Sequence, residues 1–167
     1  MKYPYYAVHD WMVRHPRFRK GLHRTAKLCT LVVYGGYPLG VLWCWAHRVQ
    51  GDLGPVVRMV AIPGITFVLG SWVRQALNRP RPYEVMDLPP VFPKNTKGKS
   101  FPSRHVFSAA VIAAAMGYLH PGLGWAFGSI ALFEAACRVV GGVHWLRDVA
   151  AGLVFGGVMG YLGFFVL

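Results

Sequence analysis

The sequence predicts an all-α fold, a polytopic membrane helical bundle with about five transmembrane helices and an N-terminal interfacial amphipathic segment. Hydrophobic residues make up 54% of the 167 residues, and the mean hydropathy of +0.37 is too high for an ordinary soluble domain or a disordered chain. The charged residues are grouped into blocks that long apolar stretches separate. Because one helix needs about 20 apolar residues to cross a bilayer, this length holds about four to six spans and little else.

Residues 1–27 form the predicted interfacial segment, and residues 28–167 form the predicted transmembrane domain. The segment carries seven Lys and Arg residues and one acid, Asp10, interleaved with aromatic residues such as Trp11 and Phe18. This mixture is typical of a segment that lies on an anionic membrane surface. The same mixture can bind nucleic acid, but beside so apolar a remainder we expect membrane lipids as partners and no nucleic acid.

Five apolar stretches account for the spans. They are residues 28–46, 53–73, 105–119, 123–140 and 146–167. The third is rich in small residues, which suits close helix packing. The fourth contains Glu134, one helical turn before Arg138, and we interpret this acid as neutralising or orienting that arginine. In the fifth, Gly156 and Gly160 form a GxxxG pair, for which packing within the chain is favoured over a dimer face.

The Pro-rich loop 74–104 carries seven Lys and Arg residues, and with five spans it shares one membrane face with residues 138–148. That face collects these candidates: Arg74, Arg81, Ser103, Arg104, His105, Arg138, His144 and Asp148. Arginine presents planar, bidentate donors that match phosphate, and a helix that begins near residue 103 adds free N–H groups and a positive dipole end. We therefore expect an anion site at this face.

The two histidines give this anion site chemical capacity. His144 and Asp148 are spaced i, i+4, so on a helix the carboxylate can hold one ring nitrogen and raise the nucleophilicity of the other. Hydrolysis of a phosphate ester would use one histidine to attack phosphorus and the other to protonate the leaving oxygen. Each part also has a plainer interpretation: Arg74 and Arg81 as interfacial anchors, His105 as a cap or a packed side chain. Lys94, Lys97 and Lys99 are expected to be solvated near the lipid headgroups.

Three ordered motifs resemble those of the type-2 phosphatidic acid phosphatase superfamily, the lipid phosphate phosphatases. That superfamily carries K-x6-R-P, then P-S-G-H, then S-R-x5-H-x3-D. In this chain, the first motif corresponds to Arg74 to Pro82, the second to Pro102 to His105, and the third to Cys137 to Asp148. Order and spacing match over residues 74–148. Three positions depart from the motifs, namely Arg74 for Lys, Arg104 for Gly and Cys137 for Ser.

The resemblance implies a role for each matched residue. His144 would be the nucleophile that forms a phosphohistidine, Asp148 would orient it, and His105 would be the general acid. The phosphate would be bound by Arg74, Arg81, Ser103 and Arg138. We expect the Arg104 side chain to point outward and to reach a second phosphate or the lipid headgroup. The resemblance implies no metal and no cofactor.

These expectations describe a membrane lipid phosphatase. Its candidate substrates are polyprenyl phosphate or diphosphate, a phosphosugar on polyprenol, phosphatidate and phosphatidylglycerophosphate. Two alternatives stay open: a lipid-to-lipid phosphotransferase that uses the same site, and a non-catalytic scaffold that binds anionic lipid. Hydropathy and motifs leave the exact lipid and the oligomeric state open.

We expect the protein in a bacterial inner membrane. The positive-inside rule keeps the basic N-terminal segment in the cytoplasm, and five spans then place the anion site on the same side. Members of the superfamily commonly have six spans and an active site on the outer face. If residues 1–27 lie on the outer leaflet instead, the site faces outward.

Overall fold

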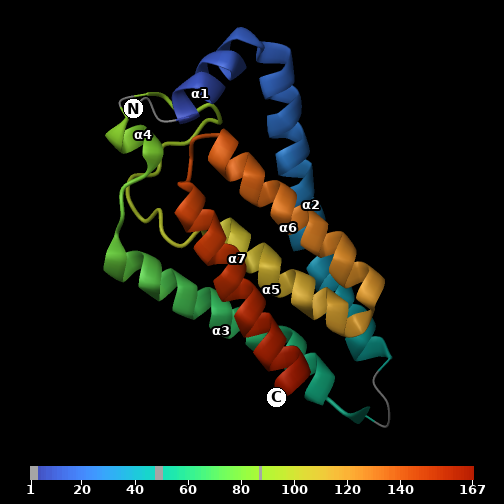
Figure 1. Ribbon diagram of the computed structural model, residues 1–167. Helices are drawn as coiled ribbons and strands as arrows, with labels where there is room; N and C mark the ends of the chain where they lie inside the picture. Colours follow the sequence, from blue (N-terminus) through green and yellow to red (C-terminus); the bar gives the residue numbers. More distant parts are fainter. Residues whose placement is uncertain (1–3, 48–50, 87) are drawn as a thin grey trace.

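The computed structural model describes residues 4–47, 51–86 and 88–167 (Figure 1). The first three residues of the predicted interfacial segment lie outside this described part. The elements are α1 (Pro4–Arg14), α2 (Pro16–Ala46), α3 (Gly54–Leu77), α4 (Pro82–Val85), α5 (Arg104–Leu119), α6 (Pro121–Val140), α7 (Leu146–Tyr161) and a π-helical end, η2 (Leu162–Val166). Over the described ranges, four helical stretches are long and apolar enough to cross a membrane: α2, α3 with α4, α6, and α7 with η2. This confirms the predicted polytopic helical bundle.

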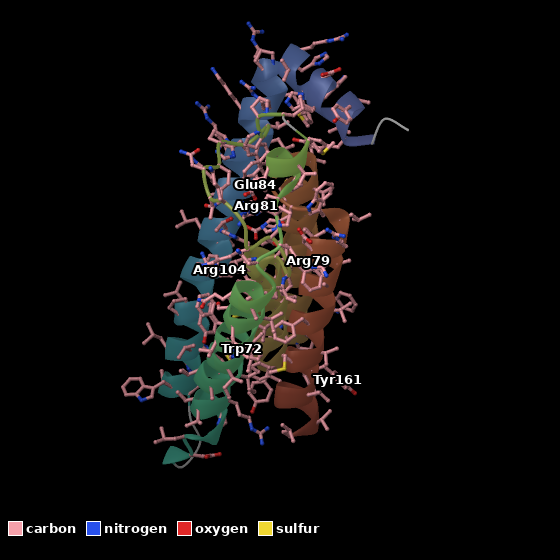
Figure 2. All side chains as sticks on the ribbon, turned by 90° about the vertical axis from the view of Figure 1, so that its left-hand side faces the viewer. Trp72, Arg79, Arg81, Glu84, Arg104 and Tyr161 are labelled. Atoms are coloured by element: carbon pink, nitrogen blue, oxygen red, sulfur yellow. The ribbon has the colours of Figure 1, made fainter. Side chains whose placement is uncertain are left out.

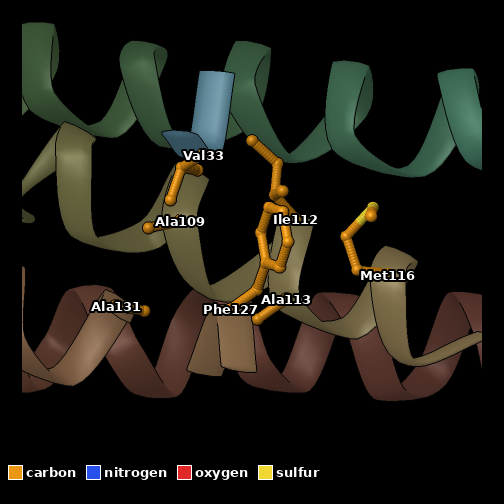
Figure 3. Close-up of a cluster of buried hydrophobic side chains, with 7 residues drawn as sticks. All are labelled: Val33, Ala109, Ile112, Ala113, Met116, Phe127 and Ala131. Atoms are coloured by element: carbon orange, nitrogen blue, oxygen red, sulfur yellow. The ribbon is translucent and has the colours of Figure 1, made fainter. Parts of the chain in front are cut away.

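Helix α5 is the shorter fifth apolar helix and forms the centre of the bundle (Figure 1). It packs against α2, α3, α6 and α7. Its 16 residues make it about 24 Å long, and its small side chains allow the neighbouring helices to come close. Figure 3 shows one of the resulting clusters, in which Val33 of α2 and Phe127 of α6 pack on Ile112 of α5.

Three glycines of α7, Gly152, Gly156 and Gly160, face α5. A Cβ atom on Gly156 would lie 2.3 Å from the carbonyl oxygen of Phe107, and a Cβ atom on Gly160 would lie 2.4 Å from the Cβ of Ala114. Both distances are far below van der Waals contact, so only glycine permits this approach of the two backbones. The GxxxG pair therefore packs within the chain, which is the interpretation that the sequence favoured. Large apolar side chains such as Val154 and Val158 point outward on the same helix.

Helix α2 is longer than the predicted first span. It runs unbroken over 31 residues, about 46 Å, so residues 16–27 are its first turns and not a separate segment. Pro16 fits the first helical turn, where its missing N–H group is not needed, and no further proline follows before Pro38. The predicted interfacial segment thus comprises α1 and these first turns. Figure 1 shows the two helices meeting above one end of the bundle.

The polar side chains gather at that same end. Figure 2 shows Arg79, Arg81, Glu84 and Arg104 in the half that carries α1 and α4, whereas Trp72 and Tyr161 lie along the apolar half. The C-terminus lies at the opposite end of the bundle (Figure 1).

The contact between α5 and α7 can be tested with two neighbouring glycines. We expect Gly156→Ala to lower the thermal unfolding temperature in detergent, because the new methyl group meets backbone and such overpacking typically costs about 1–3 kcal/mol. Gly157→Ala is the matched control, because nothing lies within 4 Å of its Cβ position and alanine favours a helix by about 1 kcal/mol. Equal unfolding temperatures for the two variants would contradict this packing.

Candidate active site

The loop between α3 and α5 folds back over the end of the bundle. Helix α3 ends where Asn78 adopts a left-handed conformation, with φ of 36°. Helix α4 then begins, and the Glu84 carboxylate accepts the backbone N–H of Arg81 at 2.8 Å. The same carboxylate accepts the N–H of Gly98, at 2.9 and 3.0 Å to its two oxygens, while the N–H of Ser100 bonds the carbonyl of Arg79. These bonds hold residues 98–100, near the end of the loop, against residues 79–84 at its beginning.

Two buried arginines are fixed by backbone carbonyls. Arg74 lies in the last turn of α3, and its Nη1 donates to the carbonyls of Ser100 and Pro102. Arg81 donates from Nε to the carbonyl of Gly98 and from Nη1 to that of Val143, both at 3.0 Å. Each guanidinium is therefore held in place by the fold itself.

His144 lies in the short turn between α6 and α7. The N–H groups of Val143 and His144 both donate to the carbonyl of Arg138, at 3.1 and 3.2 Å, so the turn closes on the end of α6. Asp148 is at the third position of α7, where its Oδ2 accepts the N–H of Trp145 at 3.0 Å. This capping bond fixes the carboxylate beside the histidine ring.

The two ring nitrogens of His144 face different partners. Nδ1 lies 3.6 Å from Asp148 Oδ2 and 3.4 Å from Ser100 Oγ, and the Ser100 hydroxyl donates to the same carboxylate oxygen at 2.5 Å. Nε2 lies 3.4 Å from Arg81 Nη1. Because a guanidinium can only donate, Nε2 is the acceptor and we assign the proton to Nδ1. The lone pair of Nε2 is thus directed toward the arginine side.

The environment keeps the His144 ring uncharged. Burial lowers its pKa from 6.5 to about 4, and the positive charges of Arg81 and Arg74 add to this, while Asp148 acts in the opposite direction. Burial likewise lowers the pKa of Arg81. Burial also lowers the pKa of Lys94, and the positive charges of four nearby arginines lower it further. At neutral pH the imidazole is therefore unprotonated and able to act as a nucleophile.

A cavity of about 170 Å³ opens in front of His144. We call it the basic cavity, since its described lining includes six basic side chains and no Asp or Glu: Arg74, Arg81, Lys94, Lys99, Arg104 and Arg138. His105 and His144 also line it, together with Ser71, Gln75, Thr96 and Val143. Such an excess of positive charge suits a polyanionic group such as phosphate.

The predicted residues come together around this cavity, with two of them behind its wall. Asp148 is fully buried behind His144. Ser103 is also fully buried, its Oγ has no hydrogen-bond partner among the described residues, and it does not line the cavity. Its backbone N–H instead donates to the carbonyl of Asp148 at 2.9 Å, and phosphate binding by its hydroxyl stays a prediction. Arg104 is exposed and lies over the ring of Phe67, in agreement with an outward direction.

Some residues at the site were not found from the sequence. Ser100 bonds the Asp148 carboxylate, yet nothing in the neighbouring sequence distinguishes it from other loop serines. All three loop lysines were expected to be solvated, but Lys94 is half-buried and lines the cavity. Lys97 and Lys99 are exposed as expected, and Lys99 also lines the cavity. Among the described residues, no group of three or more His, Cys, Asp or Glu side chains could hold a metal ion.

Comparison with known proteins identifies a family. The family model described as PAP2 superfamily matches residues 55–166. Lipid A 1-phosphatases of Rhizobium etli and Rhizobium johnstonii are 34% and 33% identical to the chain over 95 and 94 residues, which is 54% and 53% of this chain. The matched stretches make up only 40% and 38% of the length of these two relatives.

Two solved structures share the fold. A PAP2-type phosphatidylglycerolphosphate phosphatase from Bacillus subtilis superposes with a TM-score of 0.70 at 22% identity, covering 94% of this chain and 81% of the other. LpxE of Aquifex aeolicus superposes with a TM-score of 0.71, also at 22% identity, covering 95% and 91%. At this identity the likeness concerns the helical fold.

The protonation state of His144 can be measured directly. At pH 5.5 an imidazole with the ordinary pKa of about 6.5 is about nine-tenths protonated, whereas a pKa of about 4 leaves His144 neutral. We therefore expect its ¹⁵N ring shifts, in histidine-labelled protein in detergent, to stay those of neutral imidazole down to pH 5.5. The spectrum of His144→Ala identifies the signal, and a titration midpoint near pH 6.5 would contradict the expectation.

Proposed function

Because this chain belongs to the PAP2 superfamily, we propose that it is an integral membrane lipid phosphatase that hydrolyses a phosphomonoester or diphosphate on a lipid, through a phosphohistidine at His144 and without a metal ion. One observation carries the proposal. The Nε2 of a neutral, buried histidine lies at a basic cavity, while its Nδ1 lies beside the Asp148 carboxylate.

In the first proposed step, Nε2 of His144 attacks phosphorus. The phosphate oxygens take over the N–H groups of Arg81, which frees the Nε2 lone pair that this arginine otherwise holds. His105 takes up a proton from water when the anionic phosphate enters the cavity and balances its positive charges. The N–P bond forms as the bond from phosphorus to the lipid oxygen breaks, and His105 gives this proton to the leaving oxygen. Asp148 and Ser100 hold the Nδ1–H and stabilise the positive charge that develops on the ring.

In the second step, water replaces the histidine. His105, now neutral, takes a proton from the water as its oxygen attacks phosphorus, and the N–P bond breaks to release inorganic phosphate. The guanidinium groups of Arg74, Arg81 and Arg138 stabilise the charge on the phosphoryl oxygens in both steps. The cycle returns both histidines to their starting states.

The substrate remains in the bilayer while its phosphate enters the basic cavity. Our candidates are polyprenyl phosphate or diphosphate, a phosphosugar on polyprenol, phosphatidate and phosphatidylglycerophosphate. Lipid A phosphorylated at its 1-position joins them because two relatives are named lipid A 1-phosphatases. Lys94, Lys99 and Arg104 also line the basic cavity and would accept a second phosphate or an acidic headgroup.

We place the protein in a bacterial inner membrane, with the cavity on the cytoplasmic side. The loop between α3 and α5 and the turn between α6 and α7, which line the cavity, lie at the end of the bundle where α1 meets the basic first turns of α2 (Figure 1). The positive-inside rule favours the cytoplasm for that end.

The function is tested with a panel of these lipids in detergent, with EDTA present and inorganic phosphate measured. We expect wild-type turnover on at least one lipid, and a fall in kcat of about 10³-fold or more for His144→Ala, because the nucleophile is lost. His47→Ala is the matched control, since His47 is exposed at the opposite end of α2 and bonds its own helix.

Radiolabelled substrate separates the alternatives. A label on wild-type protein that survives alkali and is released by acid supports the phosphohistidine. A label that moves to another lipid indicates a phosphotransferase. Turnover retained in His144→Ala, or none by the wild type on any lipid, would contradict the proposal, and the second result would favour a lipid-binding scaffold.

Sidedness is tested with reporters at the C-terminus, which lies at the end opposite the cavity (Figure 1). For a cytoplasmic cavity we expect a C-terminal alkaline phosphatase fusion to be active and a C-terminal fluorescent protein fusion to be dark. The reverse pattern would place the cavity on the outer face.

A further inference from the structure

Arg138 is held differently from the other arginines deep in the cavity. Arg74 and Arg81 donate to backbone carbonyls, whereas Arg138 donates from Nη2 to the hydroxyl of Thr30, at 3.4 Å. Its Nε is buried without a hydrogen-bond partner among the described residues. The orientation of this guanidinium therefore depends on a side chain of another helix, α2.

Thr30 is in turn bonded to a buried acid. Its Oγ1 donates to Glu134 Oε1 at 2.5 Å, and Glu134 is 1% exposed on α6, one turn before Arg138. A charged group enclosed in a bundle is stable only when it is paired. The Thr30 hydroxyl lies between the two groups: it donates its proton to the Glu134 carboxylate and accepts an N–H of the Arg138 guanidinium.

We propose that Thr30 and Glu134 are positioning residues that hold the Arg138 guanidinium in the direction in which it binds phosphate; this inference rests on the proposed function. Anchoring one terminal nitrogen fixes the plane of the group and thereby the direction of its remaining N–H donors, which matters for a planar bidentate donor. Glu134 keeps the hydroxyl proton turned toward itself, so the oxygen lone pairs of Thr30 face Arg138.

The arrangement makes α2 part of the site. The family model matches residues 55–166, and Thr30 lies before them. Thr30 also lies 3.0 Å from the carbonyl of Ala26 in its own helix, which is the bond that a purely structural threonine would make. The contact with Glu134 Oε1, at 2.5 Å, is the shorter of the two, which favours the carboxyl group as the main partner of the hydroxyl.

The experiment compares Thr30→Val, Thr30→Ser and Glu134→Gln with the wild type, on the best lipid of the panel in detergent. We expect Thr30→Val to lower kcat/KM about tenfold and to raise the inhibition constant of orthovanadate in proportion, because a charged hydrogen bond is lost. Thr30→Ser restores both values. Glu134→Gln also lowers kcat/KM. The double variant Thr30→Val with Glu134→Gln is no more impaired than the more impaired of the two single variants, since both residues act through one chain of hydrogen bonds.

Thr66→Val is the matched control, because Thr66 is a fully buried threonine of α3 whose hydroxyl donates to the carbonyl of Ile62 in its own helix. We expect it to leave kcat/KM and vanadate inhibition unchanged. Wild-type values in Thr30→Val, a Thr30→Ser variant as impaired as Thr30→Val, or equal losses in Thr66→Val would overturn the inference.

Failure of the inference and failure of the proposed function give different results. If the wild type turns over no lipid, the proposed function fails, and calorimetric titration with inorganic phosphate then decides the inference by itself. About tenfold weaker phosphate binding in Thr30→Val than in Thr66→Val supports the role of Thr30, and equal binding overturns it.

Discussion

The contact between the backbones of α5 and α7 holds the two halves of the site together. The N–H of Ser103 donates to the carbonyl of Asp148 at 2.9 Å, and along the helices below this bond Gly156 and Gly160 allow α7 to lie directly on α5. Without that approach, the start of α5, which carries His105, would lie apart from the turn that carries His144. The contact places both histidines on one cavity.

The fold holds positive charge in place before any ligand arrives. Carbonyl groups fix Arg74 and Arg81, a threonine and a buried acid fix Arg138, and the described lining offers no carboxylate to neutralise them. Such groups repel one another, and this repulsion contributes to the lowered pKa of Lys94. A bound phosphate relieves the repulsion, so the mutual repulsion of these charges favours binding of an anion.

Much of this arrangement could be predicted from the sequence, because uncharged runs of about 20 residues have few alternatives to membrane helices. The pairing of His144 with Asp148 was predicted for two residues on one helix, but His144 lies in the turn before α7, and the capping position of Asp148 in the first turn brings the two side chains together. Ser100 and Thr30 could not be predicted, since their acidic partners lie 48 and 104 residues away along the chain and no local pattern encodes such a distance. Lys94 was misplaced because hydropathy does not tell how a loop folds back.

The glycine face of α7 has a consequence for how this protein can change. The inward side of the helix admits no added atom at Gly156, whereas Val154 and Val158 on the outward side are 65% and 51% exposed. In this helix, the residues that determine the packing of the bundle therefore lie on one side, and the residues that contact the surrounding lipid lie on the other. Evolution, or a designer who wants the same cavity in another bilayer or in water, can rewrite the outer surface while leaving the catalytic architecture as it is.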